Sequence, residues 1–144
     1  MGEYQLIKTT FQQDRELISF IREQVFIIEQ HVPVELEWDE HDHQAVHLLA
    51  MDNNRQAIGT VRLLADGHIG RMAVLSSWRK RGVGSHLLAK ITQIAQQSNM
   101  QRVFLNAQTS AVSFYSQYGF LAHTEIFMDA GIPHQYMYKS LSDQ

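Results

Sequence analysis

The chain has 144 residues, a formal net charge of −3 and a hydrophobic share of 44%, which together indicate one globular domain spanning residues 1–144. The charge argues against a general nucleic-acid binder. No cysteine is present, which excludes disulfides, thiolate metal ligands and an enzyme thioester intermediate. There is neither an apolar run of the about 20 residues that a membrane span needs nor the layout of a secretory signal. We therefore expect a cytoplasmic protein with no nucleic-acid or membrane partner.

Hydrophobic periodicity predicts alternating strands and helices. In the first half we expect a strand, a helix, an acidic loop or short helical turn, and three strands in a row, at residues 4–9, 10–25, 35–43, 47–51, 56–64 and 68–74. Thr10 and Gln13 have the spacing of a capping box. Asp66-Gly67 is a strong signal for the turn of a hairpin.

The second half predicts two further helices and three further strands. They are expected as a helix from Gly84 to about Ser98, a strand at 102–106, a helix at 110–118, and strands around 121–128 and 134–139. Gly119 is expected to end the second of these helices in a left-handed conformation. The whole order predicts an α/β fold with one mixed central sheet and helices on its faces.

The segment from Arg71 to Leu88 is the most informative part of the sequence. It reads as a strand that runs into a basic, glycine-bearing turn and then directly into an amphipathic helix. Glycines let backbone N–H groups approach a ligand closely, and the start of a helix favours phosphate. We therefore predict a pyrophosphate site formed by Arg79, Lys80, Arg81, Gly82, Val83, Gly84 and Ser85.

Other phosphate-binding loops fit this segment less well. A nucleoside-triphosphate loop needs a Gly-Lys-Ser/Thr ending, which the chain lacks. A dinucleotide fingerprint needs a small residue where Leu87 stands, and an acidic residue about 20 residues further on, where 101–104 has none. A nucleotide-binding protein that uses this loop, and a solvated basic turn that only begins a helix, remain alternatives.

The pattern at 79–84 resembles the acetyl-CoA pyrophosphate loop of the GNAT superfamily of N-acetyltransferases. Residues 102–107 resemble the next strand of that fold, and 114–120 resemble its F-Y-x-x-x-G-F helix end. Residues 25–30 and 131–134 resemble the small bacterial YjcF/ElaA-like branch, and glyphosate N-acetyltransferase is similar through 106–115 and from 133–134 to 137–139. The resemblance implies a GNAT-like acyl-CoA N-acyltransferase fold, in which the strands 68–74 and 102–106 run parallel and splay apart to admit pantetheine.

The resemblance also implies acetyl-CoA as co-substrate, a small-molecule amine, such as an amino acid or an analogue, as acceptor, and direct transfer in a ternary complex. Backbone groups at Met72, Ala73 and Val74 would pair with the pantetheine, and one N–H would polarise the thioester carbonyl. Asn106 would contact the cofactor, or is only a polar strand end. A CoA-binding sensor without acceptor turnover is the alternative function.

Two residues are implied as catalytic. Tyr115 would be the general acid that protonates the CoA thiolate, although it also fits a packed helix face. His134 would be the base that takes a proton from the substrate ammonium, and it would also contact the substrate. The alternative bases are acidic: Glu29, Glu37 and Asp39.

The resemblance implies one arginine that binds the substrate. Arg71 would bind an acceptor carboxylate, or is a charge on the strand surface. Two further substrate arginines of glyphosate N-acetyltransferase fall on Gln108 and Ile27 here. We therefore expect an acceptor with fewer negative charges than glyphosate.

The histidine-bearing segment His41–His47 matches no zinc template, so we expect no metal. Its acidic neighbours, Glu37 and Asp39 among them, are an alternative attraction for a cationic amine. The strands near either terminus are candidates for sheet edges that pair between subunits of a homodimer.

Overall fold

The computed structural model describes residues 3–32 and 40–141. In chain order its elements are β1 (Tyr4–Thr9), α1 (Phe11–Arg22), the π-helix η1 (Glu23–Glu29), the 3-10 turn η2 (Glu40–Gln44), β2 (Val46–Asp52), β3 (Ala57–Leu63), β4 (Ile69–Val74), the 3-10 turn η3 (Ser76–Trp78), α3 (Val83–Gln97), β5 (Arg102–Gln108), the 3-10 turn η4 (Thr109–Ala111), α4 (Val112–Ser116), β6 (Leu121–Asp129) and β7 (Ile132–Ser140). None of the described helices is long and apolar enough to cross a bilayer.

The predicted strands are all present, and the helices differ from prediction in two places. The continuous helix predicted at 110–118 is a 3-10 turn followed by the short helix α4. The first predicted helix changes into the π-helix η1 at Glu23. Of the loop or short helical turn predicted at 35–43, residues 35–39 lie outside the described residues. Residues 40–43 belong to the short helical turn η2.

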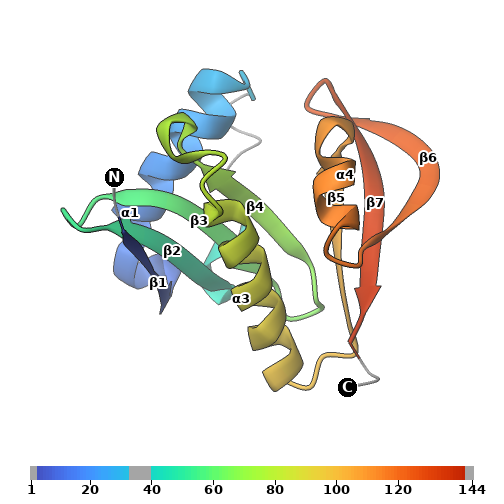
Figure 1. Ribbon diagram of the computed structural model, residues 1–144, viewed down its shortest axis with the longest axis horizontal. Helices are drawn as coiled ribbons and strands as arrows, with labels where there is room; N and C mark the ends of the chain where they lie inside the picture. Colours follow the sequence, from blue (N-terminus) through green and yellow to red (C-terminus); the bar gives the residue numbers. More distant parts are fainter. Residues whose placement is uncertain (1–2, 33–39, 142–144) are drawn as a thin grey trace.

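Two antiparallel sheets form the molecule, and Figure 1 shows them as separate halves of the ribbon. One has the strand order β1-β2-β3-β4 and the other the order β5-β7-β6. The inner strands β4 and β5 run parallel, and a single parallel bridge between His68 and Phe104 joins their starts. Beyond this bridge the described strands diverge. The predicted splayed pair is therefore confirmed. Where one mixed sheet was expected, two antiparallel sheets are joined by this single parallel bridge.

A β-bulge in β4 provides a physical reason for the divergence. Thr60 pairs with Ala73 and Arg62 with Gly70, so Arg71 and Met72 together lie opposite one residue of β3. Arg71 has a φ of 52°, a left-handed conformation that costs a non-glycine residue about 1–3 kcal/mol. A bulge of this kind bends its strand and increases the local twist, which turns the end of β4 away from β5.

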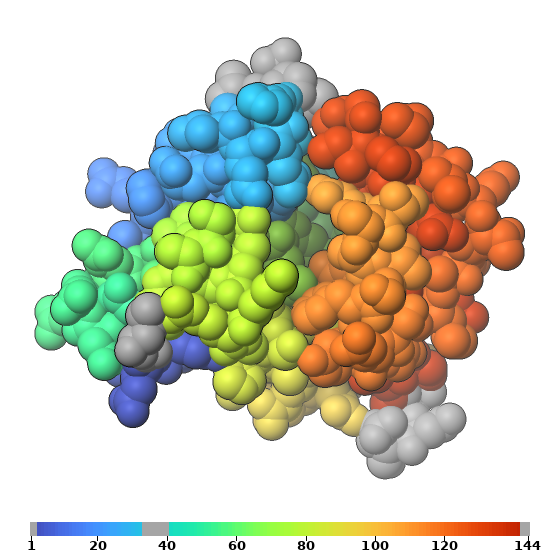
Figure 2. Space-filling model, turned by 45° about the horizontal axis from the view of Figure 1, so that its top comes forward, coloured from blue at the N-terminus to red at the C-terminus, as the bar shows by residue number. Residues whose placement is uncertain are grey.

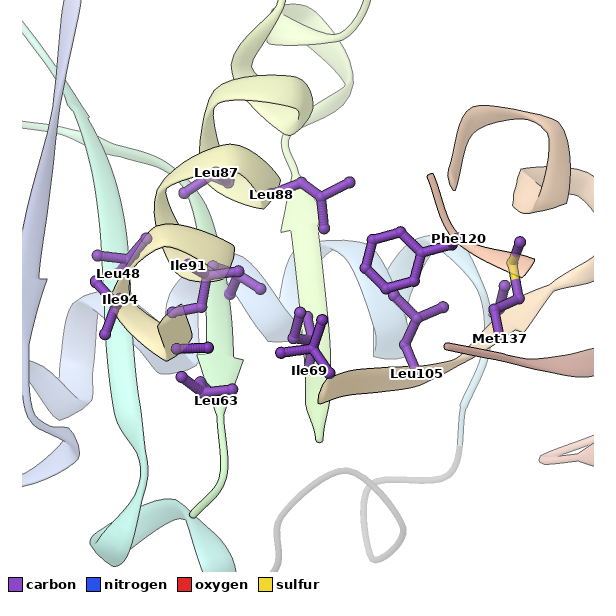
Figure 3. Packing of buried hydrophobic residues seen from close by; sticks show 14 of the residues in the cluster. Leu48, Leu63, Ile69, Leu87, Leu88, Ile91, Ile94, Leu105, Phe120 and Met137 are labelled. Atoms are coloured by element: carbon purple, nitrogen blue, oxygen red, sulfur yellow. The ribbon is translucent and has the colours of Figure 1, made fainter. Parts of the chain in front are cut away.

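The core fixes this divergence because it is continuous beneath both sheets. In Figure 3 the apolar stripe of α3 faces the first sheet, and other side chains carry the cluster into the second sheet. The labelled residues are Leu48, Leu63, Ile69, Leu87, Leu88, Ile91, Ile94, Leu105, Phe120 and Met137. Each large apolar side chain buried in this way stabilises the fold by about 1.5–3 kcal/mol.

The helix α1 covers the opposite face of the first sheet. Thr10 caps it as predicted, and its side chain accepts a hydrogen bond from the N–H of Gln13 at 3.1 Å. Ile18 and Ile21 are fully buried and belong to a second apolar cluster, which includes Ala73 of β4. The end of β4 is therefore held from the face that α1 covers.

Candidate active site

A cavity of about 440 Å³ opens where β4 and β5 diverge. Figure 2 shows a hollow there, between the blue and yellow-green parts of the chain on one side and the orange part on the other. Eight of the predicted site residues line it: Arg71, Met72, Ala73, Val74, Arg79, Asn106, Tyr115 and His134. Residues from both sheets, far apart in the sequence, thus surround one space.

The predicted pyrophosphate loop lies at the start of α3, next to this cavity. Lys80 has a φ of 63° and Gly82 a φ of 86°. Two residues of the loop therefore adopt the left-handed conformation before the helix begins. Val83, Gly84 and Ser85 are the first residues of α3, where backbone N–H groups have no acceptor within the helix. These N–H groups, together with the helix dipole, suit an anion.

Contacts with α4 and with the turn that follows it hold this loop in place. A Cβ atom on Gly84 would lie 3.7 Å from the Phe114 ring, so a larger side chain there would meet this ring. The hydroxyl groups of Ser85 and Tyr118 are 2.6 Å apart and share a hydrogen bond. The guanidinium carbon of Arg81 lies 5.3 Å from the centre of the Trp78 ring. The loop and the Tyr115 helix are therefore positioned together.

The sequence left two roles open for Tyr115, a packed side chain on a helix face and a general acid at the site, and the position of Tyr115 is compatible with both. Its ring packs edge-on against Phe114 and Phe120, at 5.1 and 6.0 Å between ring centres, and it also lines the cavity. Desolvation by burial raises the pKa of Tyr115 to about 12. The phenol therefore keeps its proton at neutral pH and can donate it.

His134 lies at the start of β7 and also lines the cavity. Its side chain is buried, and its ring stacks on Phe127 at 5.8 Å. The Nδ1 atom is 2.7 Å from the carbonyl oxygen of Ile132. Because a carbonyl can only accept, Nδ1 carries the proton, and in the neutral ring Nε2 has the free lone pair. This is the arrangement that a general base requires.

Arg79 and Glu29 form an ion pair beside the cavity. The Nη1 and Nη2 atoms of Arg79 donate to the two carboxylate oxygens of Glu29 at 2.5 and 2.6 Å. Its Nε atom donates to the carbonyl oxygen of Val74 at 2.9 Å. The hydrogen bonds and the charge of Arg79 lower the pKa of Glu29, which makes Glu29 a weaker base. The other alternative bases, Glu37 and Asp39, lie outside the described residues.

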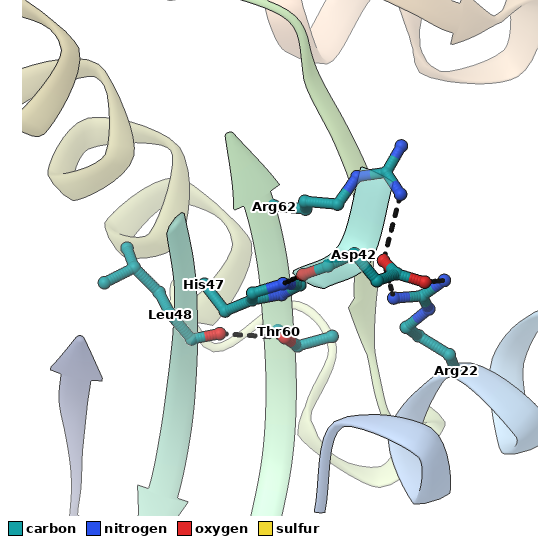
Figure 4. A network of polar contacts seen from close by, with 6 residues as sticks. All are labelled: Arg22, Asp42, His47, Leu48, Thr60 and Arg62. Atoms are coloured by element: carbon teal, nitrogen blue, oxygen red, sulfur yellow. Dashed lines mark hydrogen bonds and ion pairs between the residues drawn. The ribbon is translucent and has the colours of Figure 1, made fainter. Parts of the chain in front are cut away.

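A buried ion-pair network, which the sequence analysis missed, lies between α1 and the first sheet (Figure 4). Asp42 accepts hydrogen bonds from Arg22 at 2.8 and 3.2 Å and from Arg62 at 3.0 Å. Nε2 of His47 lies 2.9 Å from the Asp42 carbonyl oxygen. All four side chains are buried, and Arg62 also lines the cavity. The signal available in the sequence was Arg22, a charged residue that follows Ile18 by four positions and so falls on the apolar stripe of the predicted helix.

This network accounts for two members of the histidine-bearing segment that was considered for metal binding. Asp42 and His47 are engaged with protein partners. In the part of the chain that the structure describes, no three His, Asp or Glu side chains are placed to hold a metal ion.

Other cavity residues also escaped the sequence analysis as site residues. Phe26, Gln30 and Asp129 line the space, and Nε2 of Gln108 donates to Oε1 of Gln30 at 2.9 Å. They come from η1, from the residue that follows it, and from the hairpin between β6 and β7. Residues 25–30 carry part of the family resemblance, but nothing in that stretch marks Phe26 or Gln30 as lining a cavity, because only the folded chain brings these segments together.

The family model of the acetyltransferase (GNAT) domain matches residues 7–141. The chain therefore belongs to the GNAT acetyltransferases, a class of enzymes that transfer acyl groups from acyl-CoA to amines.

Relatives place it more closely. YjcF of Bacillus subtilis (strain 168), named as an uncharacterized N-acetyltransferase, is 37% identical over 123 residues, 83% of this chain and 88% of YjcF. The crystal structure of ElaA from Escherichia coli has a TM-score of 0.81 at 27% identity, covering 97% of this chain and 100% of that one. An acyl-CoA N-acyltransferase from Pseudomonas aeruginosa has a TM-score of 0.82 at 29% identity, with coverage of 97% and 100%. The predicted YjcF/ElaA-like branch and fold are confirmed.

Proposed function

We propose that this enzyme transfers an acetyl group from acetyl-CoA directly to the amine of a small molecule within a ternary complex. One observation carries the proposal. A histidine on strand β7 with a free Nε2 lone pair and a protonated phenol on helix α4 line the same cavity. Attack by an amine on a thioester needs one proton acceptor and one proton donor at the reacting atoms.

In this mechanism Nε2 of His134 accepts a proton from the acceptor ammonium, and the freed amine attacks the thioester carbonyl. A backbone N–H of the Met72–Val74 segment donates to the carbonyl oxygen as its negative charge grows. The new C–N bond forms, the C–S bond breaks, and the departing thiolate takes the proton of Tyr115. The second proton of the amine nitrogen is lost as the amide forms, and it passes through solvent to the Tyr115 phenolate, which restores the phenol. The absence of cysteine agrees with transfer in a single step.

We assign the pyrophosphate of acetyl-CoA to the loop from Lys80 to Ser85. The N–H groups at the start of α3 supply its hydrogen bonds, and the Lys80 and Arg81 side chains supply positive charge. Asn106, whose side chain is exposed at the cavity, is assigned to the pantetheine arm.

The acceptor that we propose is an amine that also carries an anionic group, such as an amino acid or an analogue. Arg71 lines the cavity at the β4 bulge, within the same space as His134. A guanidinium can hold a carboxylate through two hydrogen bonds, which would fix the amine relative to the base.

The release of free thiol from acetyl-CoA, measured across a panel of amines, amino acids and aminophosphonates, tests this function. Calorimetry should first show that acetyl-CoA binds at micromolar strength and that ATP and NAD do not compete comparably. Release that depends on an added amine would support the transferase. Binding of acetyl-CoA with no release for any acceptor would favour the CoA sensor.

Replacing His134 with asparagine should lower kcat/KM by about 10²–10⁴-fold, since general-base catalysis contributes about this much. Asparagine retains a polar side chain but cannot accept the amine proton. The matched control is His123→Asn, because His123 packs against Tyr136 and Tyr138 and is not among the residues that line the cavity. If both variants turn over at similar rates, an acidic residue is the base.

We further propose that the enzyme is a homodimer that pairs through β6. This strand is the edge of its sheet, all of its residues are exposed, and its exposed apolar side chains are Leu121, Ile126, Phe127 and Met128. An exposed apolar edge strand is a template for pairing with a second chain, and a twofold axis would make this contact self-complementary.

Light scattering should therefore give twice the mass of the chain. The Ile126→Glu change is expected to give the monomer mass, because it places a charge within the apolar edge. A monomer mass for the unaltered protein would refute the proposal.

A further inference from the structure

Arg79 differs from the other basic residues of its loop in the direction of its side chain. Each of its three guanidinium nitrogens donates a hydrogen bond within the protein, two to Glu29 and one to the Val74 carbonyl. By contrast, Arg81 lies on the Trp78 ring. The charge of Arg79 is balanced by the carboxylate that it holds, so Arg79 adds little to the positive potential at the start of α3.

Glu29 is the last residue of η1, and η1 forms part of the cavity wall through Val25 and Phe26. The next residue, Gln30, accepts a hydrogen bond from Gln108 at the end of β5. This segment is therefore bound on one side to β4, through Arg79, and on the other side to β5. It bridges the two strands at the place where they have separated.

We propose that Arg79 is a positioning residue, whose side chain fastens the η1 wall of the acceptor pocket to the cofactor strand β4 and does not bind the pyrophosphate. The inference rests on the proposed function only in calling η1 the acceptor side of the cavity and β4 the cofactor side. A π-helix is rare and has fewer favourable internal contacts than an α-helix, so contacts from outside, such as this ion pair, are needed to hold η1. The hydrogen bonds from Arg79 lower the pKa of Glu29 and those from Glu29 raise the pKa of Arg79, which keeps both charged near neutral pH.

The fastening is compatible with bound cofactor. A carbonyl oxygen has two lone pairs, so the Val74 carbonyl can accept from Arg79 and from a pantetheine amide together. Loss of the ion pair should then loosen η1 and weaken acceptor binding while the cofactor still binds. With any acceptor that turns over, Arg79→Ala and Glu29→Ala should each raise the acceptor KM by up to about fivefold, with the KM of acetyl-CoA unchanged.

A double-mutant cycle tests the inference without an identified acceptor. CoA binding is measured by calorimetry, and amide hydrogen exchange of residues 23–30 is measured with and without CoA, in Arg79→Ala, Glu29→Ala and the double variant. Both single variants should bind CoA within about threefold of the unaltered protein, since neither loses a phosphate contact. Both should exchange faster at 23–30, and the double variant should exchange no faster than either.

Two more variants make the outcome decisive. Arg81→Ala should weaken CoA binding by about tenfold or more, the size expected when a charge-assisted phosphate contact is lost, with exchange at 23–30 unchanged. Arg79→Lys keeps the charge but loses the planar fork, and should match Arg79→Ala. The inference is overturned if Arg79→Ala weakens CoA binding as Arg81→Ala does, while Arg79→Lys restores it and Glu29→Ala leaves it unchanged. Failure of the unaltered protein to bind CoA would instead refute the proposed function, and the exchange data would still test the fastening.

Discussion

Replacing Tyr115 with phenylalanine is expected to lower kcat by about 10²–10⁴-fold, the usual contribution of a positioned general acid, and to leave the fold intact. The change removes one hydroxyl group. It keeps the ring that packs on Phe114 and Phe120, so little stability should be lost. Steady-state thiol release and thermal unfolding measure the two effects separately.

The matched control is Tyr138→Phe, because Tyr138 loses the same hydroxyl from β7 and is not among the residues that line the cavity. Its kcat should stay near that of the unaltered enzyme. Burial raises the pKa of Tyr115 to about 12, so loss of its proton should not reduce the rate until well above pH 10, the ordinary value for tyrosine. A Tyr115→Phe enzyme with unchanged kcat would give the acid role to water or to another group.

Replacing Asp42 with asparagine should lower the free energy of unfolding by about 3–5 kcal/mol, the loss expected when one partner of a buried ion pair is removed. The Asp42 carboxylate accepts three hydrogen bonds from Arg22 and Arg62, and both guanidiniums stay buried after the change. Because domains of this kind are stable by only about 5–15 kcal/mol, a large part of the stability should be lost. Urea unfolding measures the difference.

Asp52→Asn is the control for this variant. Asp52 accepts two backbone hydrogen bonds in the turn between β2 and β3, and asparagine retains an oxygen that can accept them, so the change should cost about 0.5 kcal/mol or less. Equal losses for Asp42→Asn and Asp52→Asn would mean that the buried network contributes little to stability.

The same network predicts how stability depends on pH. Burial alone would raise the pKa of Asp42, but the hydrogen bonds and charges of Arg22 and Arg62 outweigh it and lower the pKa below the usual 3.8. The carboxyl then binds fewer protons in the folded state than in the unfolded state. Its stabilising effect is therefore fully present above the unfolded pKa and is lost as the pH falls through the folded pKa. Asp42→Asn should remove this part of the acid sensitivity.

The sequence by itself determined the features that depend on short stretches of chain. Periodicity located every strand and the stripe of α3, because alternation and helical spacing are local properties. The turn Arg79–Gly84 and the cap at Thr10 were also readable, because a few neighbouring residues set their geometry. These features were sufficient for the fold and the family.

Only the tertiary structure decided how distant segments meet at the cavity. Glu29 and Arg79 are 50 positions apart, and Arg22 and Asp42 are 20 apart, so no local pattern encodes either pair. The bulge at Arg71 has a residue that is uncommon in the left-handed region and therefore gave no signal. The reason is physical: an ion pair, a bulge and a π-helix each depend on packing from other elements, whereas a strand or a helix end is determined mainly by the residues that form it.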